Sequence, residues 1–245
     1  MPDHEQIYAN EASAYELLIS REDMEGNLAR ALQGIRAFEG LDVLDLGAGT
    51  GRLSCMLAPL AGSVVAVDAS RAMLDVAESK LKALGCTNWR TVVSDHRALA
   101  VADQSADVIV AGWTLCYLAS SNTKAWRRQL EWAWDEMGRV LRPGGTVIIV
   151  ETLGTGAETP AAPQFLQSYY RVLQEHYGLE HQWLRTDFRF ESAGEAERLT
   201  RFFFGDALAD RVASESANEL PECTGIWHKH NFREAFYDTR GGGKG

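Results

Sequence analysis

The stretch "LDVLDLGAGTGRL", Leu41 to Leu53, decides the fold of this chain. Apolar residues dominate its first half, and three glycines then follow at alternate positions, Gly47, Gly49 and Gly51. Glycines at this density cost backbone entropy on folding, so they indicate positive φ angles or a ligand pressed against the main chain. A strand that ends in a glycine loop and continues as a helix typically holds a nucleotide-derived cofactor. We therefore predict an α/β fold that binds such a cofactor.

The length and composition indicate a folded protein with small-molecule ligands. A chain of 245 residues is long enough for one large α/β domain, or for one domain with an inserted cap. A hydrophobic fraction of 46% is ordinary for a globular protein. The formal net charge of −10 disfavours long tracts of DNA or RNA, because binding them requires many Lys or Arg side chains against phosphates. We therefore expect a small-molecule substrate and no nucleic-acid partner.

The cysteines and the termini indicate neither a metal site nor a membrane segment. The four cysteines lie far apart and form no Cys-x-x-Cys pair, so neither a zinc site nor a disulfide framework is indicated. The first residues contain no basic region followed by an apolar segment, and no apolar run approaches the roughly 20 residues that span a bilayer. We expect a cytoplasmic protein without membrane contact. The sequence does not indicate its oligomeric state.

Short β-branched runs alternate with helical stretches between residues 41 and 151. We expect strands over residues 41–46, 63–70, 89–95, 106–113 and 146–151. We expect helices from about residue 52, over 71–85, and from about 122 to 141. Strands that are apolar at nearly every position and separated by helices are typical of a parallel sheet buried on both faces. Right-handed crossovers then make the sheet doubly wound.

The segments on either side of this core follow a different pattern. The residues before Leu41 look helical, and Ser192 with Glu195 has the spacing of a helix capping box. Further elements are expected as a helix over 164–178 and strands over 181–192 and 224–232. We predict one domain over 1–245, made of a helical cap (1–40), a cofactor-binding core (41–151) and C-terminal strands with inserted cover helices (152–240). The flanking segments are expected to cover the ligand end of the sheet.

The residues around the glycine loop distinguish between two classes of cofactor. Dinucleotide-binding loops have the pattern Gly-x-Gly-x-x-Gly, and the third of those glycines allows close helix–strand packing. Arg52 stands at that position here, and its long side chain would obstruct the packing. Asp45, just ahead of the loop, would face a pyrophosphate with like charge but suits a ligand ammonium. An NAD-dependent oxidoreductase is therefore the less favoured alternative.

Carboxylates at the ends of three successive strands favour one ligand. Asp68 ends the second strand, where either class binds the two ribose hydroxyls, and it also suits the N-cap of the next helix. Asp95 ends the third strand, where it is positioned to accept a hydrogen bond from an adenine amino group or to be a surface carboxylate. With Asp45, these residues suit a ligand that has an ammonium, a ribose diol and an adenine but no phosphate. S-adenosylmethionine has these groups.

The sequence resembles the class I S-adenosylmethionine-dependent methyltransferases, in particular the small-molecule branch related to the quinone-biosynthesis C-methyltransferases. Four blocks carry the resemblance: "VLDLGAGTGRL", "VVAVDASRAML", "VVSDHRALAVADQSADVIVAGWTLCYL" and "EMGRVLRPGGTVIIVE". The resemblance implies a Rossmann-like, doubly wound seven-stranded sheet, mostly parallel, with a C-terminal antiparallel hairpin. It also implies cofactor contacts from Asp45, Gly47, Ala48, Gly49, Gly51, Asp68, Ala69, Met73, Asp95, His96 and Trp113.

The residues after the fourth strand restrict the methyl acceptor. Methyltransferases that act on amino groups of bases or glutamine usually resemble Asn/Asp-Pro-Pro-Tyr at this place, whereas this chain has Ala111-Gly112-Trp113-Thr114. We therefore expect an O, C or S nucleophile on a small metabolite. A non-catalytic module that binds S-adenosylmethionine or a nucleotide is the alternative of a different class. An RNA methyltransferase would need a basic rim that the composition does not indicate.

No single residue stands out as the catalytic base, and the catalytic residues are left unassigned. His228 and His230 share one side of the last strand, but they lack a third ligand at metal spacing, so no metal is expected. Several aromatic side chains suit an apolar substrate pocket or a cation–π contact with a sulfonium. These are Tyr8, Tyr15, Trp113, Tyr117, Tyr169 and Tyr170.

Overall fold

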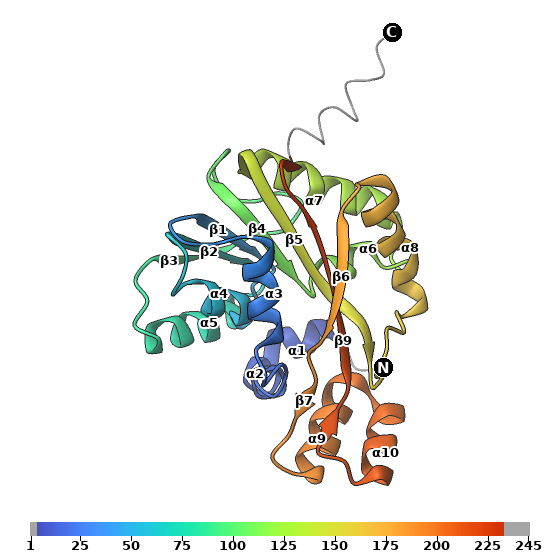
Figure 1. Ribbon diagram of the computed structural model, residues 1–245. Coiled ribbons are helices and arrows are strands. Elements are labelled where there is room, and N and C mark those ends of the chain that lie inside the picture. Colours follow the sequence, from blue (N-terminus) through green and yellow to red (C-terminus); the bar gives the residue numbers. More distant parts are fainter. Residues whose placement is uncertain (1–3, 233–245) are drawn as a thin grey trace.

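The structure is a computed structural model, and it describes residues 4–232 of the chain. Its main feature is a seven-stranded sheet in the order β3-β2-β1-β4-β5-β9-β6 (Figure 1). The strands are β1 (Asp42–Leu46), β2 (Ser63–Asp68), β3 (Trp89–Val93), β4 (Ala106–Gly112), β5 (Leu141–Thr155), β6 (Glu180–Arg185) and β9 (Glu222–Lys229). Two short strands, β7 (Phe188–Arg189) and β8 (Glu219–Leu220), form a separate pair.

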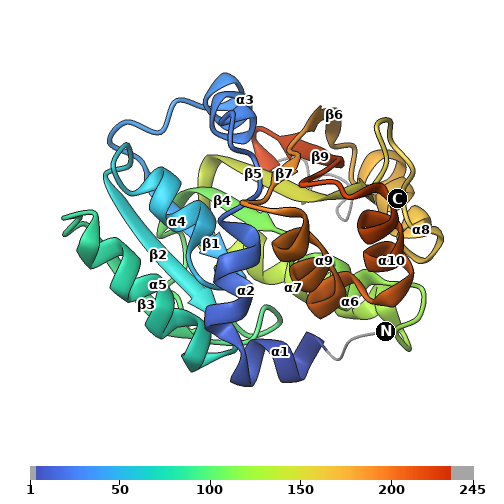
Figure 2. The ribbon, with the colours of Figure 1, turned by 90° about the horizontal axis from the view of Figure 1, so that it is seen from below.

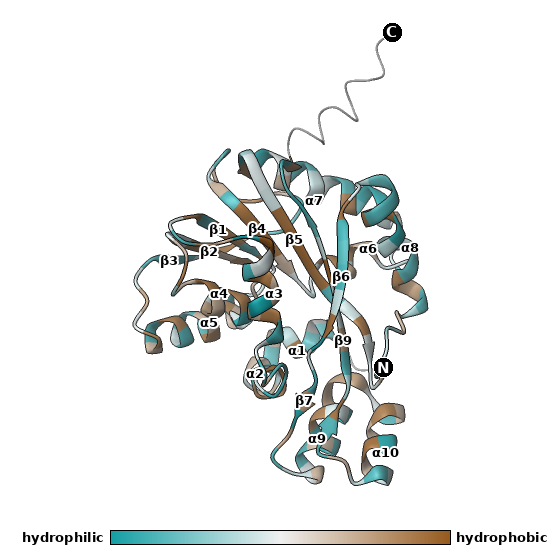
Figure 3. Ribbon diagram, in the orientation of Figure 1, coloured by the Kyte–Doolittle hydropathy of each residue, from teal (hydrophilic) through white to brown (hydrophobic). Residues whose placement is uncertain are grey.

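The strand directions confirm the predicted fold class. The neighbouring pairs from β3 to β5 are parallel, whereas β9 runs antiparallel to both β5 and β6. The predicted C-terminal hairpin is therefore the β6–β9 pair, with the β7–β8 pair and two helices inserted between its strands. Apolar residues gather on β4 and β5, whereas the edge strand β6 is largely hydrophilic (Figure 3). This pattern follows from burial, because the central strands are covered on both faces and the edge strand is not.

Helices cover both faces of the sheet. They are α1 (His4–Asn10), α2 (Ala12–Ile19), α3 (Asn27–Ile35), α4 (Arg52–Leu57), α5 (Arg71–Ala83), α6 (Leu115–Ala119), α7 (Trp126–Val140), α8 (Gln167–Arg171), α9 (Ala193–Phe204) and α10 (Asp206–Glu215). A 3-10 turn, η1 (Gln164–Leu166), precedes α8, and a π-helical turn, η2 (Val172–His176), follows it. Residues of α3, α4 and α5 form the core on one face, and residues of α6, α7, α8 and η2 form the core on the other.

A further group of helices lies at the carboxyl end of the parallel strands. The helices α1, α2, α9 and α10 lie at the lower end in Figure 1, and Figure 2 shows them from below, in front of the sheet. The helix α9 begins after Ser192, whose hydroxyl accepts a hydrogen bond from the Glu195 amide at 3.1 Å, as the capping pattern predicts. Loops at the carboxyl ends of parallel strands are where α/β proteins bind ligands. Residues 233–240 of the predicted C-terminal part lie outside the described residues.

Several element boundaries differ from the sequence prediction, and three of the differences have a local cause. The helix predicted from residue 122 begins at Trp126, after the separate short helix α6. The strand β5 begins at residue 141 instead of 146, because the "RPGG" segment continues the strand. Gly144, with φ of +77°, allows this, and the pairing of β5 with β4 is irregular at this place. The strand predicted over 181–192 is interrupted after Arg185, where the carboxylate of Asp187 accepts hydrogen bonds from Arg185 and from the Glu222 amide.

Candidate active site

The glycine loop connects β1 to α4 in a conformation that requires glycine. Gly47, Gly49 and Gly51 have φ angles of +72°, +54° and +81°, which L side chains rarely adopt. A Cβ atom at Gly47 would run into the side chain of Thr114, and one at Gly51 would lie 2.8 Å from the Cβ of Ala77. The loop is therefore shaped both by its backbone angles and by close neighbours. It is a narrow cradle at the carboxyl end of β1.

Asp68 fastens this loop to the end of β2. One carboxylate oxygen accepts a hydrogen bond from the Gly49 amide at 2.9 Å, and the other accepts one from the Ser70 amide at 2.8 Å. The N-cap of α5 is Ser70, whose hydroxyl accepts from the Met73 amide, so Asp68 is not the cap. Each oxygen of Asp68 keeps a further lone pair for a ligand, because a carboxylate oxygen accepts about two hydrogen bonds. The side chain is thus fixed in place and still able to bind a diol.

Asp45 lies beneath the loop. Its side chain is 1% exposed, and one of its oxygens accepts a hydrogen bond from the Ser54 hydroxyl at 2.6 Å. Burial raises the pKa of Asp45 to about 6, and the Ser54 hydroxyl opposes this rise. Any action of Asp45 on a ligand is therefore expected to come mainly from its charge.

Asp95 and His96 follow β3 and make different contacts. The two oxygens of Asp95 accept hydrogen bonds from the Arg97 guanidinium at 2.7 and 2.5 Å, and this pairing lowers the pKa of Asp95 to about 2. His96 points toward the glycine loop, and its Nε2 shares a hydrogen bond of 2.8 Å with Oγ1 of Thr114, the side chain that contacts Gly47. Burial lowers the pKa of His96, so the imidazole is neutral near pH 7.

The remaining predicted cofactor residues surround the same loop. Ala48 is buried, and its amide donates to the Val67 carbonyl at 2.8 Å. Ala69 is exposed just beyond β2, and Met73 is buried beside Gly49. Trp113 follows β4 with φ of +50°. The structure therefore brings these side chains to one edge of the sheet, and their contacts with a cofactor stay a prediction.

Aromatic residues from the N-terminal helices meet others from the far end of the chain. Ring centroids of Tyr8 and Tyr15 are 5.3 Å apart, those of Tyr8 and Tyr117 are 5.8 Å apart, and those of Tyr15 and Phe203 are 5.4 Å apart. The hydroxyls of Tyr8 and Tyr117 share a hydrogen bond, and the Ser70 hydroxyl donates to the Tyr8 carbonyl at 3.1 Å. We name Tyr8, Tyr15, Tyr117 and Phe203 the aromatic cluster. The sequence analysis named the three tyrosines of this cluster but not Phe203.

The other two predicted aromatic residues lie elsewhere. Tyr170 stacks on Trp227 with ring centroids 4.6 Å apart, and Tyr169 donates to the Glu151 carboxylate at 3.4 Å. These residues belong to the core under α8, whereas the aromatic cluster lies between α1, α2, α6 and α9. The six aromatic residues therefore do not form one pocket.

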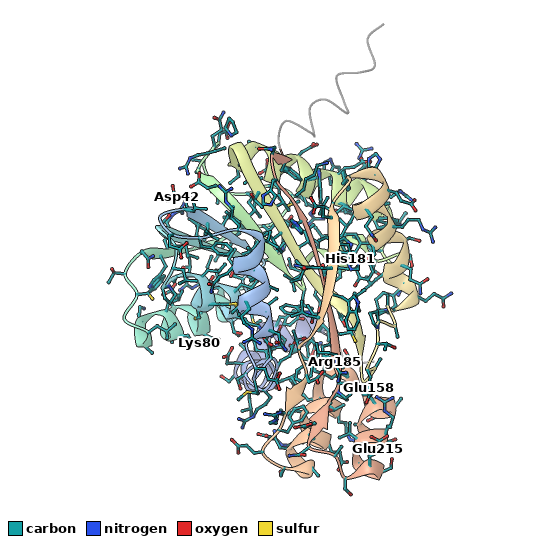
Figure 4. All side chains as sticks on the ribbon, in the orientation of Figure 1. Asp42, Lys80, Glu158, His181, Arg185 and Glu215 are labelled. Atoms are coloured by element: carbon teal, nitrogen blue, oxygen red, sulfur yellow. The ribbon has the colours of Figure 1, made fainter. Side chains whose placement is uncertain are left out.

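Ion pairs hold the N-terminal segment against the site. Arg52 donates to the Glu22 carboxylate at 2.6 Å, and its guanidinium carbon lies 4.4 Å from the ring centroid of Trp113. Lys80 of α5, labelled in Figure 4, pairs with Glu16 of α2 at 2.6 Å. These contacts hold α2 against α5 and hold the segment between α2 and α3 against the start of α4. In the sequence analysis, Arg52 had no role beyond arguing against a dinucleotide loop.

Two buried glutamates near the carboxyl end of β5 were not identified from the sequence. Glu151 accepts a hydrogen bond from the Cys116 amide at 2.9 Å, and Glu222 accepts one from the Thr152 hydroxyl at 2.6 Å. Burial raises the pKa of each carboxyl to about 8. In both, the Oε2 atom is buried without a hydrogen-bond partner among residues 4–232. The available signal was a lone acidic residue within an otherwise apolar strand.

The two histidines of the last strand lie away from this edge. His228 is paired with Ile148, in the middle of β5, and its Nε2 lies 3.6 Å from the Glu180 carboxylate. His230 shares a hydrogen bond of 3.0 Å with the Thr146 hydroxyl. Across the described part of the chain, no group of three or more His, Cys, Asp or Glu side chains is arranged to hold a metal ion. No helix within residues 4–232 has the length and apolar character needed to cross a membrane.

Comparison with known proteins shows similarity to methyltransferases. A family described as "Methyltransferase domain" matches residues 43–145. The demethylmenaquinone methyltransferase of Lactococcus lactis is 30% identical over 185 residues, which cover 71% of this chain and 69% of that protein. That of Staphylococcus aureus strain MRSA252 is 28% identical over 243 residues, covering 92% and 93%. The crystal structure of an S-adenosylmethionine-dependent methyltransferase from Aquifex aeolicus matches with a TM-score of 0.57 and 18% identity, covering 89% of this chain and 96% of that one.

The glycine loop, the sheet order and these relatives together define the chain as a class I S-adenosylmethionine-dependent methyltransferase. Within that class it belongs to the quinone-methyltransferase type, as the resemblance in the sequence implied. Its reaction is therefore methyl transfer, and the dehydrogenase alternative is not supported.

Proposed function

We propose that this chain binds S-adenosylmethionine across the glycine loop and transfers its methyl group to an O, C or S nucleophile of a small metabolite. The observation that carries the proposal is Asp68, whose two oxygens are fixed by the amides of Gly49 and Ser70. This carboxylate lies next to β1, where the strand order turns from β2 on one side to β4 on the other. Ligands of doubly wound sheets bind at such a point.

The residues present fit each part of that cofactor. The tight turn at Gly47 and Gly51 leaves the backbone free for close approach by the methionine part, with the charge of Asp45 beneath it for the ammonium. Asp68 is the partner of the ribose diol. Met73 and the loop after β3 are the partners of the adenine. When bound, the cofactor supplies an electrophilic methyl group, and the chain's own part is to align the acceptor and exclude water.

The acceptor proposed here is an aromatic molecule of small size. The aromatic cluster of Tyr8, Tyr15, Tyr117 and Phe203 closes the edge of the sheet beside the glycine loop, and such side chains line apolar ligand sites. Two relatives carry the name demethylmenaquinone methyltransferase, which also favours an aromatic acceptor. The acidic composition supports the absence of a nucleic-acid partner. A cytoplasmic location stays a prediction.

The experiment that tests the cofactor is calorimetric titration with S-adenosylmethionine, S-adenosylhomocysteine and NAD. We expect the two adenosyl ligands to bind and NAD not to bind. The variant Asp68→Ala should lose about tenfold or more in affinity, because a hydrogen bond to a charged group contributes about 1.5–3 kcal/mol. Asp75→Ala, an exposed carboxylate of α5, is the matched control and should bind normally. Binding of NAD alone, or normal binding by Asp68→Ala, would refute the proposal.

Transfer to an acceptor is tested with S-adenosylmethionine labelled in its methyl group. The panel contains 1,4-dihydroxynaphthalene under reducing conditions, catechol, thiophenol and aniline. We expect label in the hydroxylated or thiol compounds and none in aniline. Label in aniline alone would contradict the acceptor class while leaving the cofactor assignment intact.

A further inference from the structure

A buried polar cluster at the same edge of the sheet is separate from the residues that we propose to hold the cofactor. Glu22, Arg52 and Glu222 come from distant parts of the chain, and Thr186 connects them. The Thr186 hydroxyl donates to Glu22 at 2.9 Å, and the Thr186 amide donates to the Glu222 carbonyl at 3.0 Å. The side chains of Glu22 and Arg52 are 6% and 15% exposed, and Glu222 is 3% exposed. Three ionisable groups are thus withdrawn from water in one place.

Two atoms of this cluster are buried without a hydrogen-bond partner in the described part of the chain. They are Nη2 of Arg52, a donor, and Oε2 of Glu222, an acceptor. The other ends of both groups are fixed, since Nη1 of Arg52 donates to Glu22 and Oε1 of Glu222 accepts from Thr152. Buried polar groups are nearly always hydrogen-bonded in native proteins, and exceptions commonly have a functional reason. A fixed donor and a fixed acceptor without partners indicate a ligand that supplies both.

The position of these atoms connects them to the reaction. Arg52 follows directly on Gly51, the last glycine of the loop, and its guanidinium covers Trp113 at the end of β4. Glu222 begins β9 and is paired with Thr155 at the carboxyl end of β5. The two residues therefore belong to the edge of the sheet that holds the glycine loop. A molecule that reaches them enters beside the proposed cofactor site.

The charges of the cluster act on Glu222 from several elements. Burial and then the negative charge of Glu22 raise the pKa of Glu222 to about 8, while the hydroxyls of Thr152 and Thr155 and the positive charge of Arg52 oppose this rise. Asp187, from the connection between β6 and β7, accepts from the Glu222 amide at 2.9 Å. The Glu222 carboxyl therefore exchanges its proton close to pH 8, which suits a group that takes a proton from a ligand.

We propose that Arg52 and Glu222 together hold a hydroxyl group of the methyl acceptor, with Nη2 of Arg52 donating to its oxygen and Oε2 of Glu222 accepting its proton. This inference rests on the proposed function and narrows the acceptor to a phenol or an enol. A hydroxyl both accepts and donates through one atom, as the two partners require. A carboxylate has no proton to donate to Glu222, and an ether has none either.

The reaction that follows balances without another reactant. Oε2 of the ionised Glu222 takes the hydroxyl proton, and Arg52 stabilises the oxyanion that forms. The freed electron pair, on the oxygen or on a conjugated carbon, makes the bond to the methyl carbon. The electron pair of the broken carbon–sulfur bond stays on sulfur. The proton leaves Glu222 for solvent after the product departs.

Calorimetry with pairs of compounds tests the proposal, in the presence of S-adenosylhomocysteine. In each pair, one compound has the hydroxyl proton and the other has a methyl group in its place. The pairs are 2-naphthol with 2-methoxynaphthalene, and phenol with anisole. The wild-type protein should prefer the hydroxyl compound by about tenfold, since a hydrogen bond in a buried site contributes about that factor. In Glu222→Gln the Thr152 hydroxyl holds the amide oxygen, so an amino group replaces Oε2 and the preference should disappear. Arg52→Lys should lose it as well.

The matched control is Glu151→Gln, which changes a second buried glutamate with the same raised pKa. Glu151 is held by the Cys116 amide and by Tyr169, within the packing of α6 and α8, so this variant should keep the preference. In the wild-type protein the affinity for 2-naphthol should rise as the pH passes about 8, and Glu222→Gln should lose this rise. A melting curve and the affinity for S-adenosylhomocysteine show that each variant is folded.

Two results would overturn the inference. One is a wild-type protein that shows no preference for the hydroxyl compound in any pair, whether it binds both members equally, as expected if water occupies the two atoms, or binds neither. The other is a Glu222→Gln variant that keeps both the preference and the pH dependence. A wild-type protein that does not bind S-adenosylhomocysteine would contradict the proposed function instead. The two failures can therefore be distinguished.

Discussion

Replacing Glu151 by glutamine should change how the stability of the protein depends on pH. Burial raises the pKa of Glu151 from an ordinary 4.5 to about 8. The folded state therefore keeps a proton on this carboxyl over a pH range in which the unfolded chain has lost it. The resulting stability is fully present below pH 4.5 and is lost progressively as the pH rises toward 8. Glutamine does not titrate, so the stability of Glu151→Gln should not show this loss as the pH rises.

The magnitude follows from the shift. Each pH unit within the window removes about 1.4 kcal/mol, so Glu151 accounts for a loss of about 3 kcal/mol between pH 5 and 7.5, as an upper bound. The amide oxygen of glutamine can still accept from the Cys116 amide, whereas its amino group is buried without a partner and costs about 1–3 kcal/mol. That cost is the same at every pH. The difference between variant and wild type should thus slope upward with pH whatever its starting value.

Urea unfolding at pH 5, 6, 7 and 7.5 measures this difference directly. The free energy of unfolding of Glu151→Gln minus that of the wild type should rise by roughly 1 kcal/mol per pH unit. Other titrating groups are common to both proteins and cancel. Glu131→Gln, an exposed position on α7, is the control and should give a flat difference. A flat difference for Glu151→Gln would show that this carboxyl is ionised in the folded protein, and the reasoning would be wrong.

Two further predictions concern the loop and the cap. Gly51→Ala places a Cβ in contact with α5 at φ of +81°, so it should lower the free energy of unfolding in urea by about 2–3 kcal/mol. Gly85 has a φ of +72° but lies in open space, so Gly85→Ala should lower it by only about 1 kcal/mol. Equal costs would show that the close approach is not needed. Tyr8→Phe and Tyr117→Phe each remove the same hydrogen bond, so each should weaken the binding of S-adenosylhomocysteine about threefold to tenfold. The double variant should bind it no more weakly than either single variant. Additive losses in calorimetry would contradict a shared contact.

The sequence predicted the central part of the fold because its signals are local. The turn at Gly47 to Gly51 and the apolar strands around it can each be interpreted within a few residues. The extent of β5 could not be predicted, since it depends on how Gly144 lets the chain continue alongside β4. The position of Tyr169 and Tyr170 was also beyond the sequence, because a helical pattern does not say which face of a sheet the helix covers. They pack with Glu151 and Trp227 instead of joining the aromatic cluster.

The sequence could indicate the residues around the glycine loop but not the buried pair of Arg52 and Glu222, because only the former are linked by sequence spacing. Asp68 and Gly49 are close in sequence and lie on neighbouring elements, so their spacing carries the information. Arg52 and Glu222 are brought together only by the return of β9 along β5 and by Thr186 between them. No spacing encodes such a pair.

Three buried carboxylates show how the surroundings decide the role of one chemical group. Asp45 keeps a pKa of about 6 beside the Ser54 hydroxyl, so it is ionised near pH 7 and supplies a charge beneath the loop. Glu151 is protonated near pH 7, and it accepts a hydrogen bond from the Cys116 amide. Glu222 is protonated too, but Arg52 belongs to the same cluster, and its Nη2 atom has no hydrogen-bond partner among residues 4–232. Above about pH 8 the Glu222 carboxyl is ionised and can take a proton from a hydroxyl, and Arg52 can stabilise the oxyanion that remains, which is the arrangement that methylation of a hydroxyl compound requires.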